Sequence, residues 1–165
     1  HTSGIPNYTS FPKFMEDESR NPYTPEAFVK KFDEKALDFT PGEKFSYSNS
    51  GYFLLGVIAE KENDFERSLF YYNKSLDLSV EVNYDVLISE SQLSITNLYI
   101  NQKKYNEAIS SAEVALEKSR INGAKEGEKK ALYYLSQAYE LIGEFKTSLR
   151  YHKDYHKIAH EISIP

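Results

Sequence analysis

From Tyr52 onward, apolar residues recur at intervals of three and four, which is the period of an amphipathic helix. When the chain is compared with itself at an offset of 40 residues, three copies of this pattern fall into register. Two aliphatic positions, one aromatic position and one small position repeat: Leu55, Ile95 and Leu135; Leu69, Ile109 and Leu149; Phe65, Tyr105 and Phe145; Ser68, Ala108 and Ser148. A hairpin cannot bury its apolar face alone, so three copies predict stacked hairpins.

A short polar turn interrupts each copy, at residues 62–64, 102–104 and 143–144. Asn83 and the pair Asn122-Gly123 punctuate the longer links between copies. The sequence therefore predicts an all-α fold over residues 49–165, with six antiparallel helices in three 40-residue hairpin repeats.

Residues 1–48 differ in composition from the repeats, because they hold every proline except Pro165. Proline breaks helices and sheet ladders, so this segment is predicted to be mostly irregular. One short helix is expected after the possible cap Thr24 and the first-turn residue Pro25. This N-terminal arm either packs on the first hairpin or is mobile. The aromatic residues available for packing are Phe28, Phe32, Phe39 and Phe45.

Charge and composition narrow the classes of partner. The net charge is −5, and no run of Lys and Arg exceeds two residues, which argues against a nucleic-acid ligand. No cysteine is present, which excludes disulfides and thiolate metal sites. No apolar run approaches the ~20 residues that span a bilayer. Nothing in the sequence indicates a cofactor.

The repeat resembles the tetratricopeptide family. The residues that carry the resemblance are Leu55-Gly56, Phe65, Ser68, Tyr72 and Leu76 in the first copy; Tyr99, Tyr105, Ala108, Ala112 and Ala115-Leu116 in the second; and Tyr139, Phe145, Ser148 and Tyr155 in the third. The period of 40 exceeds the family's 34 and is similar to the longer-helix variety of bacterial regulatory and sensor proteins. The resemblance implies a right-handed solenoid that binds proteins or peptides. The other interpretation is an unrelated six-helix bundle.

In that family the first helix of each hairpin lines a concave groove. Projecting the repeat onto this geometry directs six side chains toward the groove: Glu90, Leu93, Asn97, Lys130, Tyr133 and Gln137. Amide and phenol groups can hydrogen-bond an extended peptide backbone. The alternative is that these residues are solvated surface positions without a ligand.

Residues 1–58 resemble the serine beta-lactamase and penicillin-binding family, in its class C and D-alanyl-peptidase branch. The matching blocks are His-Thr-Ser-Gly-Ile-Pro at 1–6, Pro-Gly at 41–42, Tyr-Ser-Asn-Ser-Gly-Tyr at 47–52 and Leu-Leu-Gly-Val-Ile at 54–58. The resemblance implies that Tyr47 assists proton transfer at a nucleophilic serine and that Asn49 contacts the substrate amide. His1 is expected to be structural.

The chemistry of that family is incomplete in this chain. Acyl transfer needs an activated nucleophile, a base and an oxyanion hole. The family's nucleophile lies in a Ser-x-x-Lys motif upstream of the first block, and helical repeats occupy the place of its later Lys-Thr-Gly block. We therefore expect a chain without catalysis of its own. The alternative is a hydrolase fragment whose nucleophile lies outside this chain, with the repeats as an interaction extension.

His152, His156 and His160 form one stripe if their segment is helical. Imidazoles one turn apart can hold a transition metal. The favoured interpretation is packing or capping rather than metal binding, because 152 and 156 align with the apolar residues Ala112 and Leu116.

Two further expectations concern the last repeat. A solvated helix start is expected at Glu126, Glu128, Lys129 and Lys130. The final helix is expected to expose Ile158, Ile162 and Ile164, which would permit self-association through the C-terminal helix.

Overall fold

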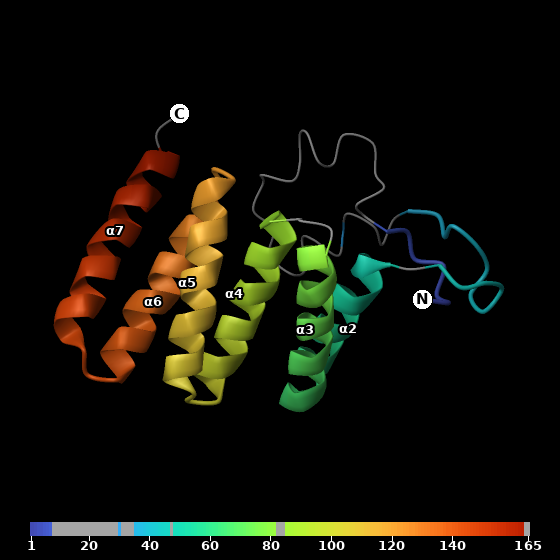
Figure 1. Cartoon of the computed structure of the whole chain (residues 1–165), viewed down its shortest axis with the longest axis horizontal. Coiled ribbons are helices and arrows are strands. Elements are labelled where there is room, and N and C mark those ends of the chain that lie inside the picture. The colour runs from blue at the N-terminus through green and yellow to red at the C-terminus, as the bar shows by residue number, and fades with distance from the viewer. Residues whose placement is uncertain (8–29, 31–34, 47, 82–84, 164–165) are drawn as a thin grey trace. The chain divides into compact units, whose positions relative to one another are not determined.

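The computed structural model describes residues 1–7, 30, 35–46, 48–81 and 85–163. Within them the regular structure is helical, with no strand, and its helices follow in this order along the chain (Figure 1): α2 (Asn49–Lys61), α3 (Phe65–Glu81), α4 (Asp85–Asn101), α5 (Tyr105–Ile121), α6 (Lys125–Leu141) and α7 (Phe145–Ser163). The predicted all-α class is confirmed. The short helix expected after Pro25 falls, apart from Lys30, outside the described residues.

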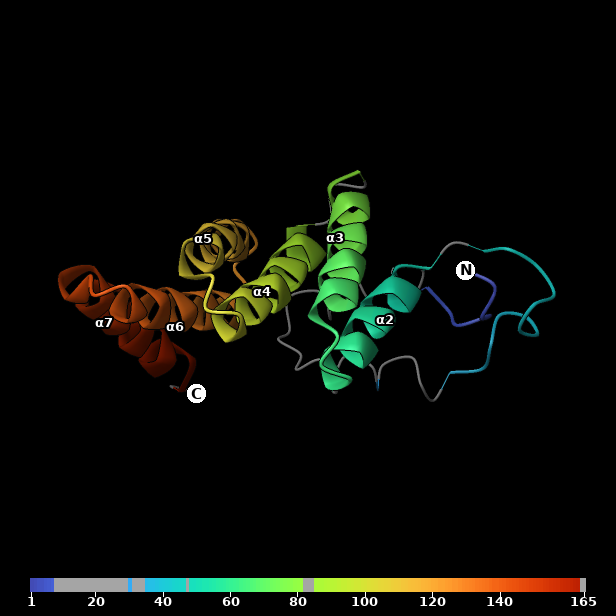
Figure 2. The ribbon, with the colours of Figure 1, turned by 90° about the horizontal axis from the view of Figure 1, so that it is seen from below.

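The chain divides into two compact units, His1–Leu78 and Ser79–Pro165. The first unit holds α2 and most of α3. In the second unit α4 packs on α5, α5 on α6 and α6 on α7, while α4 also contacts α6 (Figures 1 and 2). Within the second unit each helix thus touches its neighbour in sequence, and α4 touches the equivalent helix of the next hairpin, which is the packing of a helical-repeat solenoid.

The turn between the two helices of each hairpin is the same in all three copies. Its central residue is left-handed, at Asn63 (φ 57°), Lys103 (φ 60°) and Gly143 (φ 84°). The following amide donates to a carbonyl five residues back at 2.9 Å in each case, from residue 64 to 59, 104 to 99 and 144 to 139. A left-handed residue satisfies otherwise unpaired carbonyls at a helix end. The 40-residue period of the sequence therefore recurs in backbone conformation and hydrogen bonding.

The first hairpin is held by a close approach of α2 and α3 at Gly56. The Ser68 hydroxyl donates to the Gly56 carbonyl at 3.1 Å. The ring of Tyr72 is fully buried against Gly56, and its hydroxyl donates to Glu60 Oε2 at 2.9 Å. The small and aromatic positions of the repeat thus fix how closely these helices approach.

Substituting Gly56→Ala should destabilise the first unit by about 1–2 kcal/mol. A Cβ at this position would lie 2.7 Å from Cε1 of Tyr72. Overpacking costs about 1–3 kcal/mol, and the better helix propensity of alanine returns up to about 1 kcal/mol. Gly51→Ala in the same helix is the matched control, because its Cβ would meet nothing closer than 3.8 Å. Urea unfolding measures both. Equal effects of the two substitutions would contradict the predicted close approach.

The core of the second unit is centred on α6. Leu132 and Leu135 are fully buried there, among small residues of α5 such as Ala112 and Ala115. Near the start of α6, Ser89 and Ser119 share a buried hydrogen bond of 2.6 Å, and the bare backbone of Gly127 lies against the Ser119 hydroxyl. Aliphatic residues fill the centre of this unit, and small residues let its helices approach.

The expected exposure of the isoleucines on the last helix is wrong for Ile158. Its side chain is 7% exposed and belongs to the core cluster, and Ile162 packs against the same cluster one turn later. Ile164 lies outside the described residues. The exposed apolar side chains of α7 are Phe145 (69%) and Leu149 (53%). Self-association through the C-terminal helix stays a prediction, and it now rests on these two residues.

Candidate functional site

The predicted peptide-binding face is formed by α4 and α6, which contact each other. Its members repeat 40 residues apart, as Glu90 with Lys130 and Asn97 with Gln137. All four side chains are partly exposed, and Tyr133 is 47% exposed. The sixth predicted member, Leu93, is 4% exposed within the core cluster. We therefore define the α4–α6 face as Glu90, Asn97, Lys130, Tyr133 and Gln137, without Leu93.

Glu90 carries the clearest electrostatic signature on this face. Desolvation by burial raises the pKa of its carboxyl above the ordinary 4.5, while the ammonium of Lys130 partly opposes that rise. Burial disfavours the charged form, and a nearby opposite charge favours it. Two predicted face residues on neighbouring helices therefore interact electrostatically.

Substituting Glu90→Gln should change how stability depends on pH. A folded-state pKa above the unfolded value means that the native state binds more protons in the interval between the two. The wild type therefore loses stability as pH rises from 4.5 through the raised pKa, and Glu90→Gln lacks this loss. The stability difference, variant minus wild type, should increase with pH across that window and then level off. Urea unfolding of both chains at several pH values measures it. A stability difference that stays flat or falls as pH rises would contradict the conclusion that the Glu90 carboxyl is desolvated.

Tyr133 belongs to a patch of rings shared by α6 and α7. Its ring centroid lies 5.8 Å from that of Tyr134 and 5.9 Å from that of Tyr155. Tyr155 lies 5.1 Å from His156 and 6.1 Å from His152. We call these five residues the aromatic patch. Edge, tilted and stacked arrangements at such distances are favourable ring contacts, and the pair of Tyr133 and Tyr155 joins α6 to α7 within this patch.

The packing interpretation of the histidine stripe is wrong. His152 and His156 are exposed, although they align with the buried residues Ala112 and Leu116. In the second repeat those positions of α5 are covered by α6, whereas no described helix lies over the same positions of α7. His160 is exposed as well.

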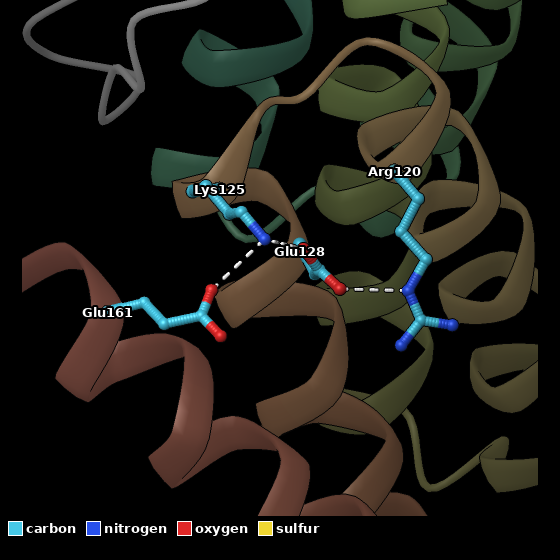
Figure 3. Close-up of polar contacts among 4 residues, drawn as sticks. All are labelled: Arg120, Lys125, Glu128 and Glu161. Carbon is cyan, nitrogen blue, oxygen red and sulfur yellow. Dashed lines mark hydrogen bonds and ion pairs between the residues drawn. The ribbon is translucent and has the colours of Figure 1, made fainter.

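The expected solvated start of α6 is wrong for Glu128, whose side chain is 8% exposed. Its carboxylate accepts from Arg120 Nε of α5 at 2.8 Å and from Lys125 Nζ at 3.3 Å (Figure 3). Lys125 also pairs with Glu161 of α7 at 3.2 Å. Bonds to Glu161 first, and to Glu128 second, raise the pKa of Lys125. These four residues form a network across three helices, which we call the Glu128 network.

The first and third hydrolase-like blocks lie together in the first unit. The amide of Ser46 donates to the His1 carbonyl at 2.8 Å, and the amide of Ser48 donates to His1 Nδ1 at 3.1 Å. The Ser48 hydroxyl caps α2 by accepting from the Gly51 amide. The imidazole also contacts the ring of Tyr52, with centroids 4.6 Å apart. The structural role expected for His1 is consistent with these contacts.

Further backbone bonds tie residues 2–4 to residues 38–42. Gly42 donates to the Thr2 carbonyl at 2.7 Å, and Asp38 donates to the Gly4 carbonyl at 2.8 Å. Gly4 has φ +73°, and a Cβ there would overlap the Phe39 carbonyl. Phe45 is 71% exposed although its ring contacts His1. Phe28 and Phe32 lie outside the described residues.

The two residues with catalytic roles by resemblance are not placed as a site. Tyr47 lies outside the described residues, and Asn49 begins α2 with a side chain that is not described. A Ser-x-x-Lys spacing does occur in the chain, at Ser10 and Lys13, which the sequence reasoning missed. It follows the His-Thr-Ser-Gly block, whereas the family places this motif before it, and it lies outside the described residues.

Among the described residues, none of the helices is both long and apolar enough to cross a membrane.

Comparison with known proteins supports both resemblances. Residues 1–69 match the Beta-lactamase family. A 119-residue stretch, 72% of this chain, is 29% identical to Tetratricopeptide repeat protein 29 of Trypanosoma brucei brucei (strain 927/4 GUTat10.1). The chain spans about a quarter of that relative's length. No solved structure matches. The chain therefore combines a beta-lactamase-like N-terminal segment with tetratricopeptide-like hairpins.

Proposed function

We propose that this chain is a protein-interaction module, a scaffold or sensor component that binds a protein or peptide and has no catalysis of its own. The observation that carries the proposal is the threefold repetition of one hairpin, with the same turn geometry and hydrogen bonds every 40 residues. The similarity to a tetratricopeptide repeat protein supports it independently. Repeats of this kind build extended surfaces that suit segments of other proteins.

The binding surface in this proposal is the α4–α6 face. Asn97 and Gln137 offer amide donors and acceptors one repeat apart, which suits the regularly spaced polar groups of an extended backbone. Tyr133 offers an exposed ring with a polar tip, the side-chain type enriched in binding sites. Lys130 supplies a positive charge on the same face, where it also acts on the desolvated carboxyl of Glu90.

A random peptide library displayed on phage tests this proposal. Peptides selected on the full chain should bind Tyr133→Glu at least tenfold more weakly than the wild type, and Asn97→Glu should also weaken them. Ser110→Glu is the matched control, because Ser110 is exposed on α5 and outside the α4–α6 face. Circular dichroism checks that each variant keeps its helices. Selected peptides that bind Tyr133→Glu and the wild type equally would contradict the proposed surface.

The second candidate is a fragment of a serine hydrolase, and the match of residues 1–69 to the Beta-lactamase family favours it. Turnover of a chromogenic beta-lactam by the full chain tests this candidate directly. Our proposal expects no turnover above buffer. Turnover that a serine-directed inhibitor blocks would support the hydrolase. Ser10→Ala then tells whether the Ser-x-x-Lys spacing within the chain supplies the nucleophile.

A further inference from the structure

The last helix brings the Nε2 atoms of two imidazoles close together. Nε2 of His152 and Nε2 of His156 lie 3.0 Å apart, one helical turn from each other. Both side chains are exposed, so solvent ions reach them. In the free protein one ring donates its Nε2 proton to the other, which requires one ring protonated at Nε2 and the other at Nδ1. Moving that single proton to Nδ1 leaves two Nε2 lone pairs at this spot.

We propose that His152 and His156 chelate one divalent transition-metal ion of the copper and nickel type. Imidazole nitrogens bind such ions at about 2.0–2.1 Å, so two nitrogens 3.0 Å apart subtend roughly 90–100° at the ion. That angle suits adjacent positions of the square-planar or tetragonal coordination of Cu²⁺ and Ni²⁺. A tetrahedral ion such as Zn²⁺ would need the nitrogens to move apart.

The two imidazoles are the only protein ligands that the proposal assigns to the ion. Within the described residues, no group of three or more His, Cys, Asp and Glu side chains is arranged around an ion position. The site therefore offers two nitrogens without the cage of oxygens that Ca²⁺ needs, and its remaining coordination positions are open to water. The ring of Tyr155 lies beside both imidazoles, with its centroid 5.1 Å from that of His156 and 6.1 Å from that of His152.

The third histidine of the stripe supplies the control. His160 is also exposed and lies one turn from His156. The hydrogen bond between ring nitrogens that joins His152 and His156 has no counterpart between His156 and His160. If helical spacing alone made a site, His160 would serve as well as His152. The geometry assigns the site to the first pair.

Titration of the full chain, prepared without a histidine tag, tests the proposal. Isothermal calorimetry with Ni²⁺ alone should show one equivalent per chain that is absent from the double variant H152A/H156A. Each single substitution should weaken that equivalent at least tenfold, whereas His160→Ala should leave it within twofold. The affinity order should be Cu²⁺ above Ni²⁺ above Co²⁺, the usual order for nitrogen sites, with no saturation by Mg²⁺.

Three results would overturn the proposal. One is Ni²⁺ binding of the same stoichiometry and affinity in the double variant, which would place the ion elsewhere. Another is a loss of affinity in His160→Ala equal to that in His152→Ala. The third is a stoichiometry of one ion per two chains, which would mean that each chain supplies one ligand to a metal-bridged dimer. All three positions are exposed, so the substitutions should leave the helical ellipticity unchanged, and this is checked in each variant.

Discussion

Substituting Leu132→Ala is expected to destabilise the second unit by about 2–5 kcal/mol, the largest effect of any substitution considered. Leu132 is fully buried at the centre of α6, in the cluster that joins α4, α5 and α7. Truncation removes apolar contacts and leaves a cavity that close-packed helices fill only in part. In a small domain such a loss is a large fraction of the total stability. Urea unfolding followed by helical ellipticity measures it.

Leu141→Ala in the same helix is the matched control. Its side chain is 48% exposed, so its truncation should change the free energy of unfolding by no more than about 0.5 kcal/mol. If the two substitutions cost the same, α6 would not face the core with Leu132, and the packing described for the second unit would be incorrect. Because the chain forms two units, unfolding is fitted with two transitions where the data require them.

Substituting Glu128→Ala is expected to cost about 2–3 kcal/mol, the second largest effect. The substitution removes a nearly buried carboxylate that bonds both Arg120 and Lys125 (Figure 3). Hydrogen bonds to charged groups contribute about 1.5–3 kcal/mol. The two cations are about half exposed, so water solvates them after the substitution, and the cost stays below that of leaving a charge buried.

Glu161→Ala removes the outer carboxylate of the same network and serves as the comparison. Glu161 is 41% exposed and pairs only with Lys125 among the contacts shown, so its loss should cost about 0–1 kcal/mol. High salt should reduce the smaller effect more than the larger one, because exposed pairs are screened more strongly. Equal costs for the two substitutions would contradict the buried position of Glu128.

The repeat could be predicted from sequence because its determinants are local. Helical periodicity, the polar turns and the small residue at Ser68, Ala108 and Ser148 each depend on neighbours a few residues away. The left-handed turn residues are less obvious. Gly143 and Asn63 tolerate that conformation, whereas Lys103 does so only because the flanking helices impose it. The 40-residue period predicts that Lys103 occupies the left-handed position of the turn, but its residue type does not.

The side chains whose burial could not be predicted from sequence are those whose surroundings depend on which helices pack together. Glu128 reads as an ordinary charged residue near a helix start, and only the approach of α5 and α7 buries it within an ion-pair network. Projection onto the geometry of the repeat family predicts Leu93 in the groove, yet its side chain lies in the core. His152 and His156 were expected to pack because aligned residues do so. The covering of a helix face is set by the next helix rather than by the repeat register.

Nuclear magnetic resonance mapping of a selected peptide on the isotope-labelled full chain tests the central claim most directly, because it locates the binding surface without any substitution. The account predicts that the largest chemical-shift changes fall on α4 and α6, around Asn97, Tyr133 and Gln137, and that the exposed side of α5 around Ser110 stays unchanged. Changes centred on α5, or on the segment of residues 1–46, would contradict the assignment of binding to the α4–α6 face.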